Sequence, residues 1–171
     1  LIQQFKSRTI KKVYLALVEG HIQPEKALID APIGRDPANR KRMAVIEPGR
    51  NLSAQASQTR YEVTEKFAEH SLVTCYPITG RTHQIRVHLE TFSRHILGDH
   101  LYGIKNDRQA QILLHAYVIY FIHPTTKKRC QFSAPLSKAM KDYLEKNFDQ
   151  EIINEQLPQA NFERHFDISA S

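Results

Sequence analysis

The sequence predicts an α+β (mixed α/β) domain built on a mainly antiparallel sheet with flanking helices. Three observations predict it: short β-branched runs are separated by Gly and Pro, successive runs lie close enough in the chain to form antiparallel pairs, and only two segments have helical periodicity. Strands that run before and between isolated helices are typical of this class.

The expected strands are short apolar or alternating runs at residues 12–20, 27–33, 42–46, 59–64, 72–76, 112–122 and 129–134. Neighbours in this series are expected to pair as antiparallel strands. Residues 27–33 are expected to pair with 42–46 around a basic loop, 59–64 with 72–76, and 112–122 with 129–134. Gly20 ends the first run and Pro77 ends the fifth, since both residues interrupt regular strands.

Helical periodicity occurs at 82–92 and at 136–144. The apolar residues that share one face are Ile85, Leu89 and Phe92 in the first segment, and Leu136, Met140, Tyr143 and Leu144 in the second. From Phe148 onward the sequence is polar and irregular, and we expect a loosely attached tail. The chain is therefore divided into a body at 1–148 and a polar, acidic tail at 149–171.

The chain carries 24 Lys and Arg against 18 Asp and Glu, a net charge of +6. The acidic excess of residues 151–171 leaves 23 basic and 14 acidic residues in positions 1–150, a net charge of +9. A basic body favours an acidic partner such as nucleic acid, although basic globular proteins without that role are common. No apolar run approaches the ~20 residues of a membrane span. The only cysteines, Cys75 and Cys130, are typical of a reducing compartment, so we expect a cytoplasmic protein.

The stretch from Gly80 to Arg86 leads from a strand into a helix and contains two arginines. A helix N-terminus is the positive end of the helix dipole, so Arg81 and Arg86 are unfavourable there unless an anion lies nearby. A carboxylate or a phosphate would supply that anion. The alternative is that both side chains point to solvent or pair with surface acids.

Tyr14 is out of phase with Val13 and Leu15 in the first strand, so it faces away from the surface on which they pack. It can stack on a base or lie at the edge of the core. The basic residues of the loop suit a phosphate backbone or a solvated surface equally well; they are Arg35, Arg40, Lys41 and Arg42. The histidines show no metal-binding spacing, so no metal site is expected.

Five stretches in order carry a resemblance to a known family: residues 12–20, 31–33, 77–88, 98–103, and 114–116 followed by His123-Pro124. They resemble the RluA-like pseudouridine synthases. The resemblance implies a long, bent antiparallel sheet and a basic cleft that holds ribosomal or transfer RNA. It also implies isomerisation of uridine to pseudouridine with no cofactor and no metal.

By the same resemblance, Arg86 pairs with the catalytic aspartate of the family, and Tyr14 lies against the flipped base and can serve in proton transfer. Substrate contacts are expected from residues of the turn and of the basic loop, namely Arg81, Thr82, His83, Gln84, Arg35, Arg40 and Arg42.

The family's catalytic aspartate lies in a His-Arg-Leu-Asp block upstream of the Tyr14 motif, and this sequence does not contain that block. Its own aspartates lie outside any such context, among them Asp30, Asp36, Asp99 and Asp107. We therefore predict the C-terminal part of a synthase, inactive by itself, whose sheet is completed by a missing N-terminal segment or by a second copy. The alternatives are a catalytically inactive RNA-binding or RNA-chaperone module and a basic structural protein without an RNA role.

Overall fold

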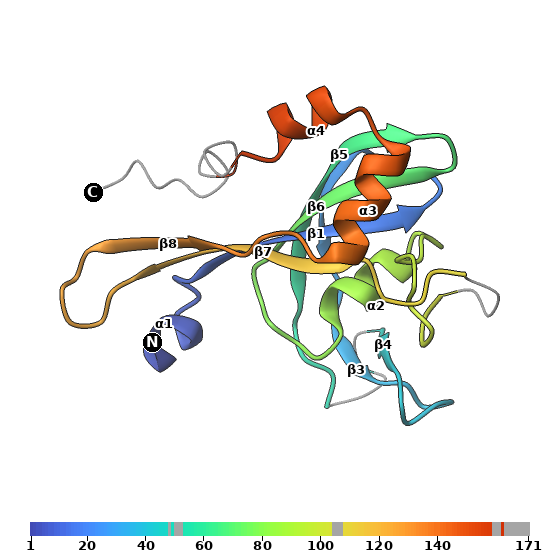
Figure 1. Ribbon diagram of the computed structural model, residues 1–171. Helices are drawn as coiled ribbons and strands as arrows, with labels where there is room; N and C mark the ends of the chain where they lie inside the picture. Colours follow the sequence, from blue (N-terminus) through green and yellow to red (C-terminus); the bar gives the residue numbers. More distant parts are fainter. Residues whose placement is uncertain (48, 50–52, 104–107, 159–161, 163–171) are drawn as a thin grey trace.

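The computed structural model describes residues 1–47, 49, 53–103, 108–158 and 162 (Figure 1). Its main sheet is antiparallel and has six strands in the order β2-β5-β6-β1-β7-β8. These are β1 (Lys11–Glu19), β2 (Lys26–Asp30), β5 (Gln58–Phe67), β6 (His70–Pro77), β7 (Leu114–Ile122) and β8 (Arg129–Ser133). A small second sheet pairs β3 (Ile33–Arg35) with β4 (Met43–Val45). The helices are α1 (Ile2–Lys6), α2 (Gln84–Glu90), α3 (Lys138–Asn147) and α4 (Gln150–Gln156), so the predicted α+β class is confirmed.

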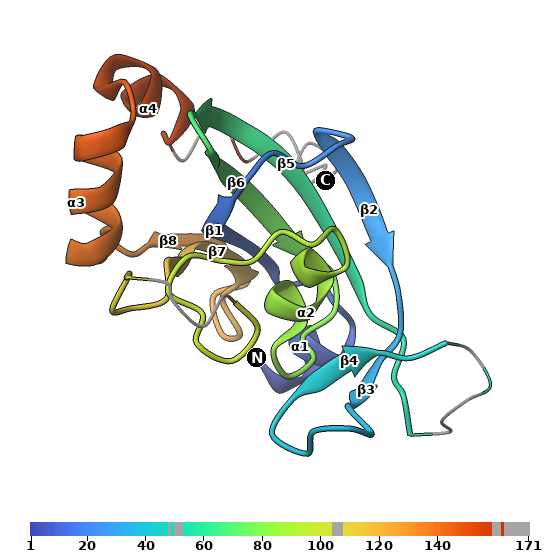
Figure 2. The ribbon, with the colours of Figure 1, turned by 90° about the vertical axis from the view of Figure 1, so that its right-hand side faces the viewer.

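Both faces of the main sheet are buried at its centre, in strand β1. Val13 and Leu15 point to one face, where they pack in a cluster with Met140 of α3 and Ile153 of α4. Their neighbour Ala16 points to the opposite face, which α2 covers with its apolar side. The strand is apolar along most of its length because each face has a helix to cover it (Figure 2).

Two of the three predicted strand pairs are confirmed: β5 pairs with β6, and β7 pairs with β8. The run at 27–33 is instead divided into two strands. Its first part, β2, pairs with β5, and only its end, β3, pairs with β4. The division falls at Pro32, which has no N–H to donate to a ladder and therefore interrupts the strand.

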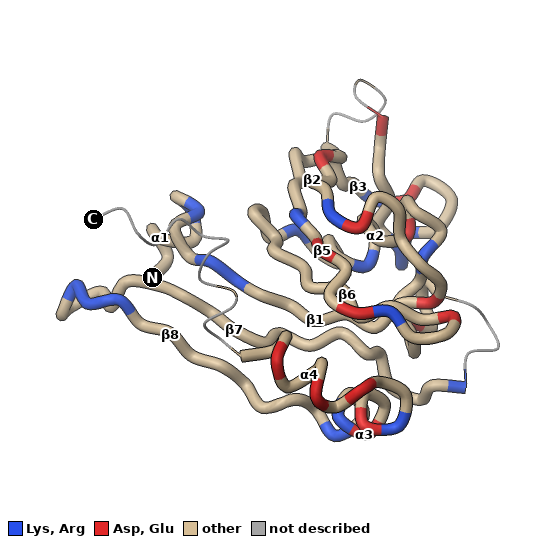
Figure 3. The backbone as a smooth tube through the Cα atoms, turned by 90° about the horizontal axis from the view of Figure 1, so that it is seen from above, with Lys and Arg blue, Asp and Glu red and all other residues tan. Residues whose placement is uncertain are grey.

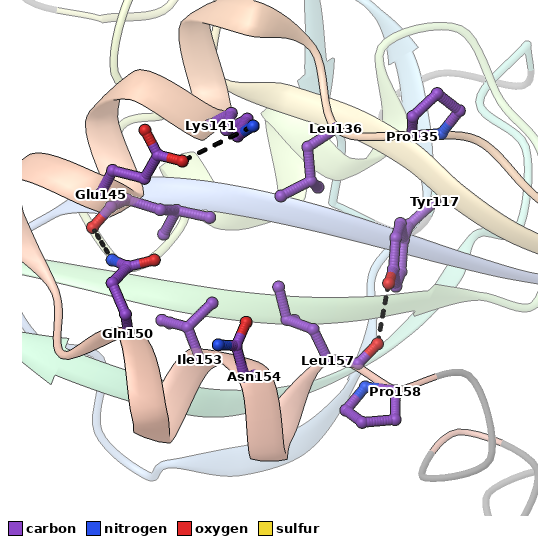
Figure 4. Close-up of a pocket in the computed structure, with 11 residues that line it drawn as sticks. Tyr117, Pro135, Leu136, Lys141, Glu145, Gln150, Ile153, Asn154, Leu157 and Pro158 are labelled. Carbon is purple, nitrogen blue, oxygen red and sulfur yellow. Dashed lines mark hydrogen bonds and ion pairs between the residues drawn. The ribbon is translucent and has the colours of Figure 1, made fainter.

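The prediction of a loosely attached tail after Phe148 is wrong for the described residues. Helix α4 begins after Asp149, whose side chain accepts hydrogen bonds from the N–H groups of Glu151 and Ile152. Leu157 is buried in the same cluster as the centre of β1, and its carbonyl accepts a hydrogen bond of 2.8 Å from the Tyr117 hydroxyl. A hollow of about 420 Å³ remains between α3 and α4 (Figure 4). The end of the predicted acidic tail, at 163–171, lies outside the described residues.

Strands β7 and β8 form a long hairpin that projects away from α2 (Figure 1). Helix α1 is attached to this hairpin through Gln4, whose amide donates to the Ile122 carbonyl at 2.7 Å and accepts from the Ile122 N–H at 2.9 Å. None of the described helices has the length and apolar character needed to cross a membrane.

Candidate functional site

The turn between β6 and α2 is fastened to the sheet by the Gln84 side chain. Its amide oxygen accepts from the Thr79 hydroxyl at 2.6 Å and from the Arg81 N–H at 3.0 Å. Its amide nitrogen donates to the Gln58 carbonyl and to the Thr59 hydroxyl, both at 2.9 Å. All four hydrogen bonds of the amide are made within the protein, and the residue is buried. Gln84, expected to contact the substrate, therefore has an internal role in this structure.

The same network continues to a buried histidine on α2. Thr59 hydrogen-bonds His88 Nδ1 at 2.8 Å, and His88 Nε2 lies 3.0 Å from the Ala31 carbonyl. Since a carbonyl can only accept, Nε2 carries the proton and Nδ1 accepts from the threonine hydroxyl. Burial lowers the pKa of His88. The ring is therefore held neutral, and it joins α2 to β5 and to the segment that follows β2.

The Arg86 guanidinium is held by a carboxylate of this chain. Its Nε donates to Asp99 Oδ2 and its Nη2 donates to Asp99 Oδ1, both at 2.8 Å. The expectation that Arg86 requires an anion is confirmed. From the sequence this anion was expected in a missing segment, whereas Asp99, in the loop after α2, supplies one within this chain.

Asp99 is buried, with a side chain 1% exposed. Burial by itself raises the pKa of a carboxyl group, but hydrogen bonds from Arg86 and from the N–H groups of Tyr102 and Leu101 outweigh it, and the pKa of Asp99 is lowered. The carboxylate is thus ionised and has no free edge. It can hold Arg86 in place, but it cannot reach a substrate.

Two glycines shape the loop that carries Asp99. Gly98 has φ +76°, and a Cβ added there would lie 2.0 Å from the Gln111 carbonyl oxygen. Gly103 donates its N–H to the Asp99 carbonyl at 2.7 Å, and an added Cβ would lie 2.4 Å from the same oxygen. Asp99 lies in the stretch 98–103 that carries part of the family resemblance, and this was the signal in the sequence that could have identified it as a site residue.

Tyr102 lies between the site and the basic loop. The guanidinium carbons of Arg86 and Arg42 lie 4.8 and 4.9 Å from the centre of its ring. Its hydroxyl accepts from the Met43 N–H at 2.8 Å and lies 2.9 Å from His83 Nδ1. Arg42 is additionally paired with Glu90 of α2. Arg42 of the basic loop and Arg86 of α2 therefore contact the same aromatic ring. No role for Tyr102 was expected from the sequence.

The other predicted substrate residues lie around this cluster. Thr82, Arg35 and Arg40 are exposed, and Arg35 donates to the Arg40 carbonyl at 3.1 Å. Arg81 is half-buried and donates to the Ala56 carbonyl at 3.2 Å. The structure therefore brings Arg42, His83 and Arg86 together around Tyr102, and leaves the remaining cations at the surface.

Tyr14 lies on β1 between Cys75 of β6 and Ala116 of β7. Its side chain packs at the edge of the cluster on the α2 side of the sheet, so it does face away from Val13, as expected. Helix α2, which carries Arg86, covers this side. Within the described residues, no hydrogen bond or ring contact joins the two side chains.

The chemical capacity of the site rests on the part of Arg86 that Asp99 does not use. Asp99 occupies Nε and one hydrogen of Nη2, and among the described residues no acceptor takes a hydrogen bond from Nη1. The side chain is 19% exposed. A second anion can therefore approach the outer edge of a guanidinium whose inner edge is already fixed.

The sequence matches the family model described as RNA pseudouridylate synthase over residues 1–91. An "uncharacterized RNA pseudouridine synthase" of Helicobacter pylori (strain J99) is 36% identical over 163 residues, 92% of this chain and 49% of that protein. "Ribosomal large subunit pseudouridine synthase C" of Vibrio cholerae is 36% identical over 153 residues, 84% of this chain and 46% of that protein. The solved structure of "Human RNA Pseudouridylate Synthase Domain Containing 1" is 31% identical with a TM-score of 0.69, covering 78% of this chain and 58% of that one.

The chain thus spans about half the length of the curated relatives it matches. The family model covers more than half of the chain, and the solved structure shares its fold over 78% of the chain. The motif resemblance to the RluA-like enzymes is confirmed. The chain belongs to the RNA pseudouridylate synthase family.

Proposed function

We propose that this chain is the C-terminal part of an enzyme that isomerises uridine to pseudouridine in RNA, and that Arg86 orients the nucleophilic carboxylate. The observation that carries the proposal is the uneven use of this guanidinium. Asp99 fixes one edge, and the other edge is available to an anion, while Tyr14 packs on the sheet face that α2 covers. A carboxylate held there stays ionised, because an adjacent guanidinium lowers its pKa.

The reaction breaks the bond between C1′ of the ribose and N1 of the base, and then joins C1′ to C5 of the same base. C5 loses its proton and N1 gains one, so the product is an isomer of the substrate and no further reactant is consumed. The site has to stabilise the detached sugar, hold the base while it turns, and move one proton. We assign the first task to the carboxylate oriented by Arg86, and contact with the flipped base and the proton transfer to Tyr14.

We propose ribosomal RNA as the substrate, since the Vibrio cholerae relative is named for the large ribosomal subunit. We assign contacts with its phosphates to Arg35 and Arg40, which are exposed in the loop beside Tyr102. A cytoplasmic location is consistent with Cys75 and Cys130, which are both free thiols.

The nucleophilic carboxylate is proposed to come from polypeptide outside these 171 residues, as is the segment that covers the edge of the sheet. Strand β8 forms that edge and leaves Phe132 60% exposed. An apolar side chain exposed on a strand that is at the sheet edge among the described residues favours a further strand or helix on this surface. We propose the polypeptide that precedes Leu1 in a longer protein. A concentration-dependent dimer of the 171-residue chain in sedimentation would indicate a second copy instead.

The test compares Arg86→Lys with Arg60→Lys, a matched change at an exposed arginine of β5, in the protein extended to the length of its relatives. Each protein is incubated with ribosomal RNA from a strain that lacks it, and new pseudouridines are mapped. A lysine ammonium can still pair with Asp99, but it lacks the second edge of a guanidinium and cannot orient two anions at once. Arg86→Lys should therefore lose about 100-fold or more in turnover with little loss of RNA affinity.

Normal turnover in Arg86→Lys would contradict the proposed role. Salt-dependent binding without any pseudouridine from the unaltered extended protein would favour the inactive RNA-binding module.

A further inference from the structure

The positive charge of the protein is concentrated in one projecting part of the molecule. We define the distal arm as residues 1–12 and 119–133, which are α1, the start of β1 and most of the β7–β8 hairpin. It contains Lys and Arg at seven positions and no Asp or Glu: Lys6, Arg8, Lys11, Lys12, Lys127, Lys128 and Arg129. The whole chain has a net charge of +6, so everything outside the arm has a net charge of −1. The protein is basic because of this arm.

The two segments lie side by side. Lys11 is in register with Tyr120 and Lys12 with Ile119, so the start of β1 lies directly beside β7. Gln4 fastens α1 to Ile122 by two hydrogen bonds. Figure 3 shows Lys and Arg at the hairpin tip, on α1 and along the start of β1, and no Asp or Glu among them.

The charges extend from the tip toward the candidate site. At a rise of about 3.3 Å per residue, the hairpin turn lies about 30 Å from the level of Tyr14. At the other end of this row, Lys12 Nζ reaches the turn before α2, where a Cβ added to Gly80 would lie 3.4 Å from it. Lys127 and Lys128 are exposed at the tip. A row of cations of this length matches a linear polyanion better than a single phosphate group.

We infer that the distal arm binds the sugar-phosphate backbone of the RNA at a distance from the uridine that reacts. This inference rests on the proposed function, which brings a polyanion to the other end of the row. Phosphate contacts of this kind add affinity and orientation without reading sequence. The arm would favour structured RNA whose stem extends past the site over a short oligonucleotide.

The test compares two triple variants that each lower the net charge by three. Lys127→Gln, Lys128→Gln and Arg129→Gln change the arm. The control changes three lysines of α3, where Asp142 and Glu145 already pair with two of them: Lys138→Gln, Lys141→Gln and Lys146→Gln. Affinity is measured between low and moderate salt for an rRNA stem-loop with a long stem and for the same loop on a stem too short to reach the hairpin.

For the long stem, the arm variant should reduce the slope of log Kobs against log salt by about two to three and weaken low-salt binding by about tenfold or more. The control should change the slope by less than about one, and neither variant should affect the short stem. Thermal melting verifies the fold. The single variant Lys128→Gln, expected to change the slope by about one, replaces the triple variant if that one does not fold.

Equal slopes for the arm variant and the control would overturn the inference. The inference would also be overturned if the arm variant lost binding to phosphatidylserine vesicles while its binding to RNA was unchanged. These outcomes leave the proposed function intact, because the unaltered chain still binds RNA. If the unaltered chain has no salt-dependent affinity for RNA, the proposed function itself fails.

Discussion

Arg86 and Asp99 form a two-point ion pair that links helix α2 to the loop following it, with both N–O distances at 2.8 Å. The carboxylate is buried and also caps two N–H groups of its own loop. A guanidinium held in this way has one orientation, and this fixed orientation is what the proposed reaction requires of it.

Asp99→Asn should cost about 3 kcal/mol or more in the free energy of unfolding, because it leaves the partly buried Arg86 charge without a counter-ion. The matched control is Asp142→Asn, which breaks an exposed pair with Lys138 and should cost less than about 1 kcal/mol. Urea unfolding of both variants measures the difference. Equal losses would mean that the Arg86–Asp99 pair contributes no more than a surface pair.

The same pair predicts a dependence on acid. The pKa of Asp99 is lowered in the folded state, so its contribution is complete above the ordinary Asp pKa of about 3.9 and is lost as the pH falls through the lower, folded value. The stability difference between the unaltered protein and Asp99→Asn should therefore be constant near neutral pH and decrease below about pH 4. A difference that grows with acidification would contradict the lowered pKa.

His88 predicts a second pH effect, at a higher pH. Burial lowers its pKa, so below the ordinary value of about 6.5 the unfolded chain takes up a proton that the folded protein does not. As the pH falls from 7 to 5, proton uptake by this residue in the unfolded chain should reduce the free energy of unfolding by up to about 1.4 kcal/mol per pH unit. NMR titration of the ring should give a midpoint below about 6.5. A higher midpoint would require a different arrangement of the hydrogen bonds to Thr59 and Ala31.

Gly98→Ala should be far more harmful than Gly49→Ala, although both glycines have positive φ, +76° and +89°. Alanine at either position has the strain of a left-handed conformation, about 1–2 kcal/mol. At Gly98 the new Cβ also meets backbone atoms of Gln111, whereas at Gly49 no atom of the described residues lies within 4 Å of it. We expect Gly98→Ala to prevent folding or lower the melting temperature sharply, and Gly49→Ala to lower it by a few degrees. Similar melting temperatures would contradict the close approach of Gln111.

Two adjacent residues of α4 test whether this helix belongs to the core. Ile153 is 5% exposed and packs in the cluster with Leu144, whereas Ile152 is 36% exposed. Ile153→Ala should cost about 2–4 kcal/mol and Ile152→Ala less than about 1. Both values come from urea unfolding, and comparable small losses would show that α4 is attached only loosely.

The strands were predictable because their pattern is local. The run at 12–20 has a β-branched, apolar sequence ended by glycine, and the structure forms β1 over nearly the same residues. Helix α4 was missed although Asp149 caps it and Ile153 and Leu157 lie one turn apart, because the other residues of the segment are polar and only its packing reveals the apolar side.

The site was predictable only in part. The position of Arg86 near a helix N-terminus indicated an anion, and periodicity placed it on α2. Its partner could not be identified by spacing, since Asp99 reaches it only through the loop geometry that Gly98 and Gly103 permit. The role of Tyr102 depends on the packing of the β3–β4 hairpin against α2, which no local pattern in the sequence specifies.

The position of Tyr102 between Arg42 and Arg86 makes the basic loop and the candidate site one thermodynamic unit. Whatever withdraws Arg42 from the ring changes the surroundings of the other guanidinium, and the reverse holds equally, because free-energy coupling between two sites is reciprocal. Binding of a polyanion to the basic loop and binding of an anion by Arg86 on α2 therefore influence each other.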